Sequence, residues 1–352
     1  MSGQVKFAGL LVVMLCLTDV TRGECPVELY VSSDFGHEVL RYDGTTGALA
    51  DVFVPVSSNG PLTEPHSLIA RTADVLVASF ATDQVLRFDR TTGNYLGEFI
   101  GAASGLDAPV YMAYGPDGNL YIASQASDEI LRYTPAGAFV DAFVPAGSGG
   151  LDGPSGFAFG SDDRLYVAGR YSANVLAYAA ASGTFLEQVL GSADGLTSGD
   201  TFGLNVGASG DMYVASNNHV YRYSLASGTV VAAIPLGFPI GIEPGPAGGV
   251  FVASSNNLYV IDESDNTLSG AFLAGGAINV LNFFHFAPVL PQTPGDGDCD
   301  GDVDLADLAL LTACLTGPAA TSPAPLCRAA FDADADADID LRDFATFAAQ
   351  FE

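Results

Sequence analysis

The chain has 352 residues, 41 of them acidic and 12 basic, so its formal net charge at pH 7 is −29. Such a negative surface repels phosphate backbones, which excludes nucleic acid as an expected partner and favours cations. Hydrophobic residues make up 49% of the chain and 41 residues are glycine, a composition typical of short apolar strands joined by glycine-rich turns.

The first 23 residues have the pattern of a secretory signal peptide. Lys6 precedes an apolar run over 7–17, and Thr21-Arg22-Gly23 supplies a cleavage site. That run is too short to cross a bilayer. We therefore expect an exported protein, secreted or held at the cell surface, with no membrane span. An uncleaved N-terminal anchor is the alternative.

Two motifs recur in step along residues 24–288. One is LYVSS at 29–33, repeated as VLVAS, LYIAS, LYVAG, MYVAS and VFVAS. The other is VLRY or a close variant, and it begins at Val39, Val85, Ile130, Val175, Val220 and Leu258. Each copy contains about four strand-like runs in about 45 residues, which is the unit of a β-propeller blade.

The two ends of this repeat complement one another. The first copy has no inner strand before it, and the run AINVLNFF at 277–284 has no blade after it. Pairing the last strand into the first blade would remove two exposed sheet edges. The sequence therefore predicts an all-β, six-bladed propeller, each blade a four-stranded antiparallel sheet.

Strand alternation divides the inner-strand residues into two sets. One set is expected to wedge between blades and the other to turn toward the central channel, where small residues suit strands that crowd an axis. The first set is Leu68, Met112, Phe157, Leu204, Ile242 and Val280, and the second is Ser67, Tyr111, Gly156, Gly203, Gly241 and Asn279.

Two of these segments carry a family resemblance. LDAPVYMAYGPDGNLYIAS at 106–124 and LDGPSGFAFGSDDRLYVAG at 151–169 resemble NHL repeats. The resemblance implies a propeller over residues 24–288. NHL-type propellers serve as binding scaffolds, lyases and lactonase relatives, so the resemblance does not select a function.

The polar candidates for a channel site are Asn205 and Glu243, at equivalent levels of adjacent inner strands, with Asn279 near them. Lactonase-like propellers hold a divalent metal through carboxylates and amides at the axis. Two polar ligands are too few for a cation, so a hydrated channel lining is the simpler interpretation. The remaining positions predicted at that level are apolar: Ile69, Ala113, Ala158 and Leu281.

The four histidines do not suggest a catalytic cluster, because they fall on different blades and loops: His37, His66, His219 and His285. His66 stands near the start of an inner strand, where it would face the channel mouth or form part of its rim. The sequence predicts no catalytic residue.

A proline-rich linker at 289–295 leads into an alternating aspartate motif, DGDCDGDVDLAD at 296–307. This matches an EF-hand loop, with oxygen ligands at alternate positions, Gly301 at the sharp turn and a closing carboxylate at position 12. The predicted calcium ligands are Asp296, Asp298, Asp300, Asp302, Asp304 and Asp307.

A second loop lies 36 residues further on, with Ala337 in place of the turn glycine. An alanine there costs about 1 kcal/mol where φ must be positive, so the second site should be the weaker. Helix-like apolar patterns follow both loops, at 305–315 and 341–351. A solvated acidic tail is the alternative. The predicted ligands of this loop are Asp332, Asp334, Asp336, Asp338, Asp340 and Asp343.

Two loops that each lead into one helix resemble a dockerin domain, over residues 296–352. The resemblance implies two bound calcium ions and a cohesin-like partner. In cellulosomal dockerins, positions 10 and 11 of each loop are often Ser-Thr and help to select the cohesin. Here they are Leu305-Ala306 and Leu341-Arg342, while the calcium ligands are retained.

Four cysteines remain after signal cleavage: Cys25, Cys299, Cys314 and Cys327. An exported chain permits disulfides, and four cysteines allow three pairings. Cys314 with Cys327 is the favoured pair because they bracket a proline-rich loop.

These observations predict a secreted, non-catalytic binding protein. Its propeller would recognise an extracellular polysaccharide or protein, and its calcium-dependent tail would attach it to an extracellular assembly. Two alternatives stay open. One is a lactonase- or lyase-type propeller enzyme with a targeting tail, and the other is a tail that only stabilises its own chain.

Overall fold

The computed structural model describes residues 26–58, 60–246, 248–273, 278, 281–289, 296, 303, 307–308, 311, 314, 330–332, 339 and 341–348. The chain divides into two compact units, residues 26–289 and a second unit made of the remaining residues. The predicted signal peptide and most of the predicted linker lie outside the described residues. So do the following predicted site residues and cysteines: Asn279, Cys25, Cys299, Cys327, Asp298, Asp300, Asp302, Asp304, Asp334, Asp336, Asp338 and Asp340.

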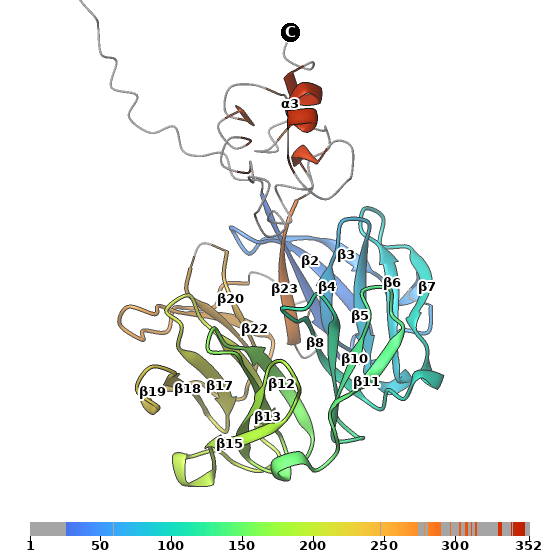
Figure 1. Cartoon of the computed structure of the whole chain (residues 1–352). Helices are drawn as coiled ribbons and strands as arrows, with labels where there is room; N and C mark the ends of the chain where they lie inside the picture. The colour runs from blue at the N-terminus through green and yellow to red at the C-terminus, as the bar shows by residue number, and fades with distance from the viewer. Residues whose placement is uncertain are drawn as a thin grey trace, which may run out of the picture. The chain divides into compact units, whose positions relative to one another are not determined.

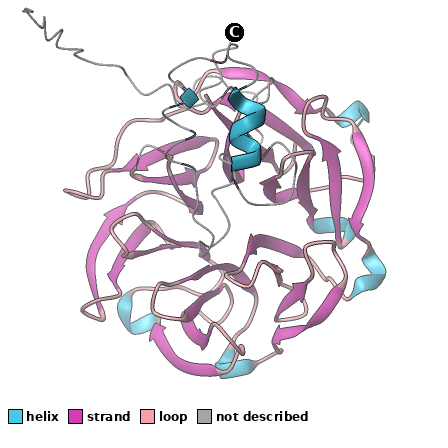
Figure 2. Cartoon of the chain, turned by 45° about the horizontal axis from the view of Figure 1, so that its top comes forward, coloured by secondary structure: helices cyan, strands magenta, loops and turns pink. Residues whose placement is uncertain are grey.

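The larger unit is a six-bladed β-propeller, as the repeats predicted, with its sheets arranged around one axis (Figures 1 and 2). Blade 1 contains β1 (Val27–Ser33), β2 (Glu38–Asp43), β3 (Leu49–Val54) and β23 (Leu281–Pro288). Blade 2 contains β4 (Pro65–Ala70), β5 (Asp74–Ser79), β6 (Gln84–Asp89) and β7 (Tyr95–Ile100). Blade 3 contains β8 (Pro109–Tyr114), β9 (Leu120–Ser124), β10 (Glu129–Tyr133) and β11 (Phe139–Val144).

The other three blades follow in chain order. Blade 4 contains β12 (Pro154–Phe159), β13 (Arg164–Gly169), β14 (Asn174–Ala179) and β15 (Phe185–Leu190). Blade 5 contains β16 (Thr201–Val206), β17 (Met212–Ser216), β18 (His219–Ser224) and β19 (Thr229–Pro235). Blade 6 contains β20 (Pro239–Pro244), β21 (Val250–Ser254) and β22 (Asn257–Ile261).

The last strand closes the ring, and this prediction is confirmed: β23 pairs antiparallel with β1, from Val27 opposite Pro288. The predicted bounds of this strand, 277–284, were wrong, because β23 runs from 281 to 288. Its register is set at a bulge, where Asn282 and Phe283 of β23 stand opposite the single residue Ser32 of β1. There the buried Ser32 hydroxyl donates to the Phe283 carbonyl oxygen at 2.8 Å and accepts from the Phe283 N–H at 3.1 Å.

Removing that hydroxyl should weaken the closure. Ser32→Ala would leave the buried N–H and C=O of Phe283 without this partner, at a cost of about 2 kcal/mol of unfolding free energy. Chemical denaturation followed by tyrosine fluorescence measures it. Ser58→Ala, at an exposed serine, is the control and should stay within about 0.5 kcal/mol. Equal stabilities of the two variants would contradict this account of the register.

Blade 6 departs from the prediction of four regular strands in every blade. Its sheet has three strands in the part of the chain that the structure describes, β20 to β22. The chain after β22 still follows that strand, through an isolated bridge between Ile261 and Leu268 and an N–H bond from Ser269 to the Val260 carbonyl. It does so without a continuous ladder.

Alternation correctly predicted five of the six residues between blades: Leu68, Met112, Phe157, Leu204 and Ile242 are all at most 3% exposed. The sixth, Val280, lies outside the described residues. The prediction that three glycines face the channel was wrong. A Cβ on Gly156 would lie 2.7 Å from the Leu204 nitrogen, and one on Gly241 would lie 2.5 Å from the Asn282 oxygen. These glycines allow neighbouring inner strands to approach backbone to backbone.

The second unit is described at few positions. Helix α3 (Leu341–Ala348) falls within the predicted helix at 341–351, and Asp307, Leu308, Leu311 and Cys314 are helical within the predicted 305–315. A small apolar cluster contains Leu311, Ala330, Phe331, Ile339 and Phe347. Cys314 is disulfide-bonded, and the predicted pairing with Cys327 remains a prediction. No helix among the described residues is long and apolar enough to cross a membrane.

Candidate functional site

The inner strands present equivalent residues to the axis at successive levels. The second residues, such as His66 and Asn282, line one cavity of about 320 Å³, the N-end cavity. The fifth residues, such as Glu243 and His285, line another of about 370 Å³, the C-end cavity. Between these levels the rings of Tyr111 and Phe283 meet at 5.8 Å. The two ends of the channel are therefore separate candidate sites.

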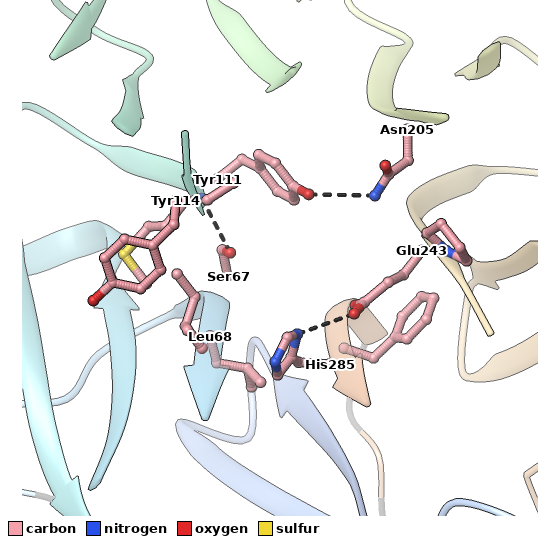
Figure 3. Close-up of a pocket in the computed structure, with 12 residues that line it drawn as sticks. Ser67, Leu68, Tyr111, Tyr114, Asn205, Glu243 and His285 are labelled. Carbon is pink, nitrogen blue, oxygen red and sulfur yellow. Dashed lines mark hydrogen bonds and ion pairs between the residues drawn. The ribbon is translucent and has the colours of Figure 1, made fainter. Parts of the chain in front are cut away.

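The C-end cavity contains the predicted pair Asn205 and Glu243, which the structure brings to one cavity (Figure 3). Glu243 Oε1 forms an ion pair with His285 Nδ1 at 3.0 Å. The Asn205 amide donates to the Tyr111 hydroxyl at 3.4 Å and to the Ile242 carbonyl at 3.3 Å. Burial, and secondarily the charge of Glu243, raises the pKa of Tyr111 above its usual range, so this phenol stays protonated.

The sequence reasoning missed His285 at this level. It assigned Leu281, because it began the closing strand four residues too early. The observed register places Glu243 opposite Phe251 and His285 opposite Tyr30, which are equivalent positions of blades 6 and 1. The same shift gives Phe283, and not Asn279, the third position of the closing strand.

The N-end cavity is built by a repeated loop. A buried serine ends the second strand of most blades and ties down the chain that enters the inner strand. The Ser79 hydroxyl, for example, donates to the Thr63 carbonyl and accepts from the Thr63 N–H. The next residue then faces the cavity. In blades 1 to 4 this residue is Asp34, Phe80, Gln125 and Arg170.

His66 is one of the residues that line this cavity. Its ring stacks on Phe80, with centroids 4.6 Å apart, and its Nε2 lies 3.3 Å from Asn282 Nδ2 and 3.9 Å from Asp34 Oδ1. Because an amide N–H donates, Nε2 accepts and Nδ1 carries the proton. Burial, and secondarily the positive charge of Arg170, lowers the pKa of His66 to about 3. His66 is therefore neutral at physiological pH.

This neutral histidine makes stability depend on pH. Its pKa is about 3 in the folded protein and 6.5 ordinarily, so the unfolded chain binds more protons below pH 6.5. The unfolding free energy should therefore decrease as the pH is lowered. Of this decrease, His66 should account for about 2 kcal/mol between pH 7 and pH 5. His66→Gln should lack that part of the loss in denaturation curves at the two pH values. Identical pH dependence of both proteins would contradict the buried neutral state.

Two polar atoms of this cavity are buried without a hydrogen-bond partner within the described residues, Asp34 Oδ1 and His66 Nδ1. Burial raises the pKa of Asp34, and a hydrogen bond from Asn282 opposes that rise. Unsatisfied buried groups of this kind are costly, and they point to a bound water or ligand. The sequence reasoning identified only His66 here.

The described part of the chain offers few groups that could bind a metal ion. Among the described positions, no set of three or more His, Cys, Asp or Glu side chains could hold a metal ion. Most of the predicted calcium ligands are not among those positions. The described ones are the first and last of each loop. Asp296, Asp307 and Asp343 are at most 1% exposed, and Asp332 is partly buried.

Among the comparisons with known proteins, only the solved structures bear on the fold. The sequence matches no protein-family model, and no curated protein matches it. A chain in the crystal structure of a nidogen/laminin complex is 15% identical, covers 74% of this chain and 98% of its own length, and has a TM-score of 0.59. The structure of catalytically inactive virginiamycin B lyase from Staphylococcus aureus with quinupristin is 15% identical. The match covers 77% of this chain and 94% of the lyase chain, with a TM-score of 0.53.

A third similar structure is a gluconolactonase from Xanthomonas campestris. It is 18% identical, with 67% of this chain and 86% of that chain covered and a TM-score of 0.53. At such identities the likeness shows the six-bladed propeller alone. The three structures include a binding protein and two enzymes, so they favour neither class.

Proposed function

We propose that this chain is an exported binding protein. Its propeller recognises an extracellular ligand in the N-end cavity, and a dockerin-like calcium-binding tail attaches it to an extracellular assembly through a cohesin-like partner. The observation that carries this proposal is the composition of the N-end cavity. It combines aromatic walls with charged and amide side chains, and two of its buried polar atoms have no partner in the described structure.

The chemistry of His66 supports recognition over catalysis in this cavity. A general base works best when its pKa lies near the working pH. A histidine whose pKa is about 3 accepts protons poorly at neutral pH, although its Nδ1–H can still donate to a ligand. The cavity volume, about 320 Å³, lies within the range of small-ligand sites.

Burial of the loop ends supports calcium binding by the tail. A carboxylate that is almost completely buried requires a counter-charge, and a divalent cation would supply it to several such groups together. Val303 and Ile339, at position 8 of the two loops, belong to one apolar cluster. This is consistent with two loops packed side by side, each followed by its helix.

The experiment is affinity capture by the immobilised full chain from extracellular material of its natural source. We expect one set of captured molecules to disappear with a calcium chelator and another to disappear with the double variant Phe35→Ala/Arg170→Ala. The first set identifies the tail partner and the second the propeller ligand. Capture that neither treatment changes would contradict the proposal.

The rival function is a propeller enzyme of lactonase or lyase type. The specific observation in its favour is the Glu243–His285 ion pair beside the Tyr111 hydroxyl in the C-end cavity, since a carboxylate–imidazole pair is a common acid–base unit. If a chain lacking residues 290–352 retained bound metal and lost it on Glu243→Ala, the binding-protein proposal would be wrong for the propeller.

A further inference from the structure

The charged residues of the N-end cavity stand on opposite walls. Asp34 and Arg170 occupy the same position of the repeat, directly after the second strands of blades 1 and 4. Blades 1 and 4 are three positions apart in a ring of six, which is half a turn about the axis. Glu64 lines the cavity on the Asp34 side, at the entrance to blade 2. One wall is therefore acidic and the opposite wall is basic.

Arg170 differs from every other arginine of the propeller. Within the described residues of 26–289, each of the others forms an ion pair with a carboxylate: Arg41, Arg71, Arg87, Arg90, Arg132, Arg164 and Arg222. Arg170 forms none. Its Nε–H donates to the Gly199 carbonyl at 3.0 Å and its guanidinium lies 4.5 Å from the centre of the Phe202 ring. Its Nη1–H also donates to Gln125 Oε1 at 3.5 Å. All these partners are uncharged, and a guanidinium without a carboxylate is unexpected in so acidic a unit, unless a ligand supplies the anion.

Asp34 also forms no ion pair with an arginine among the described residues. The side chain is 12% exposed, His66 lies 3.9 Å away and is uncharged, and His37 is the one basic group whose charge opposes the rise of the Asp34 pKa. Oδ1 has no hydrogen-bond partner in the described structure. A carboxylate enclosed to this degree is stabilised when a donor or cation reaches it.

Apolar groups line the cavity between these charges. Phe80, Phe202 and Phe283 line it, together with Val110 and Ile240. At the mouth, the side chain of Phe35 is 59% exposed, although it is a large aromatic group. A ligand that satisfies all of these groups has a cation at one end, an anion at the other and an apolar side chain.

We propose that the N-end cavity binds a zwitterionic amino acid or short peptide with an apolar side chain. Its ammonium group pairs with Asp34, its carboxylate pairs with Arg170, and its side chain lies among the phenylalanines. This inference rests on the proposed binding function and specifies the ligand class of that site. The planar guanidinium suits a bidentate pair with a carboxylate.

The test is calorimetric titration of the full chain with phenylalanine, Gly-Phe and Gly-Gly-Phe, a series in which the separation of the two charges increases. Each ligand is also titrated with its amino end acetylated and with its carboxyl end amidated. We expect one length to bind best, and either modification to weaken it at least about tenfold, the usual worth of a charge-assisted hydrogen bond.

Two variants test which residue binds the amino end of the ligand and which binds its carboxyl end. Asp34→Asn should weaken the zwitterion but leave the acetylated ligand unchanged, whereas Arg170→Gln should weaken the zwitterion but leave the amidated ligand unchanged. Arg164→Gln is the matched control, because Arg164 is in the same blade but pairs with the exposed Glu187. It should not change any affinity.

The inference is overturned if no member of the series binds, or if blocking either end leaves the affinity unchanged. Failure of the proposed function gives a different result. If the peptides fail but Arg170→Gln still abolishes capture of another extracellular ligand, the cavity is a binding site and only the ligand class is wrong. If Arg170→Gln affects neither, both proposals are wrong.

Discussion

Gly203→Ala is expected to destabilise the propeller by about 3 kcal/mol or more, the upper range of overpacking effects in a close-packed interior. Gly203 is a buried residue of β16. A methyl group there would overlap the carbonyl oxygen of Ile240 and lie 3.1 Å from the nitrogen of Ile242. Both atoms belong to the backbone of β20, so they cannot rotate away. The inner strands of blades 5 and 6 would have to separate.

Chemical denaturation followed by tyrosine fluorescence measures this loss. Gly237→Ala is the matched control, because no atom lies within 4 Å of a Cβ built there and its φ is not positive. It should change the unfolding free energy by less than about 0.5 kcal/mol. If Gly203→Ala proved as stable as this control, the backbone-to-backbone packing of neighbouring inner strands would be wrong.

Calcium removal is expected to unfold the C-terminal unit and to leave the propeller folded. Six aspartates in each short loop repel one another without a cation, and three described loop-end carboxylates are almost fully buried. Ligand binding of this kind supplies folding free energy directly. The two units have separate signals, because all 14 tyrosines lie between residues 30 and 259. A chelator should abolish the helical circular dichroism signal and leave the tyrosine unfolding transition unchanged.

Variants of single loops sharpen this prediction. Asp343→Asn should remove the weaker step of a two-step calcium titration and Asp307→Asn the tighter one. Ala337→Gly should tighten the second step about fivefold, since it restores glycine at the turn and recovers about 1 kcal/mol. Asp51→Asn, at a surface carboxylate of the propeller, should change nothing. A helical signal that does not respond to calcium would contradict the EF-hand interpretation and leave the acidic-tail alternative.

Repeats made most of the fold predictable. The recurring serine and the apolar residues before it mark the second strand of each blade, and a period of about 45 residues gives the blade count. The register of the closing strand could not be predicted in this way. It is set by Ser32, whose side chain replaces a backbone ladder partner for Phe283 at a bulge, and alternation of side chains does not report a bulge.

The site was predictable where it depends on register alone. Asn205 and Glu243 share a level because they hold the same position of adjacent repeats. His285 was not predicted at that level, because the register of β23 was predicted wrongly. The N-end cavity was missed because its charged residues belong to loops. A signal for it exists in the sequence: the residue after the repeated serine or glycine changes character from blade to blade, from Asp34 to Phe80, Gln125 and Arg170. Positions fixed in space but varied in chemistry are typical of recognition surfaces.

Closure of the ring by β23 also determines the order in which the chain can fold. Strands within blades 2 to 5 are neighbours in sequence, so each of these sheets can form from local contacts as the chain is made. Blade 1 is different, because Ser32 meets Phe283 across 251 residues. Contacts of such high sequence separation are slow to form, since a long loop must close before they contribute any stability. We expect docking of β23 onto β1 to be the late step of folding, and the ring to remain open until residues 281–288 have been synthesised.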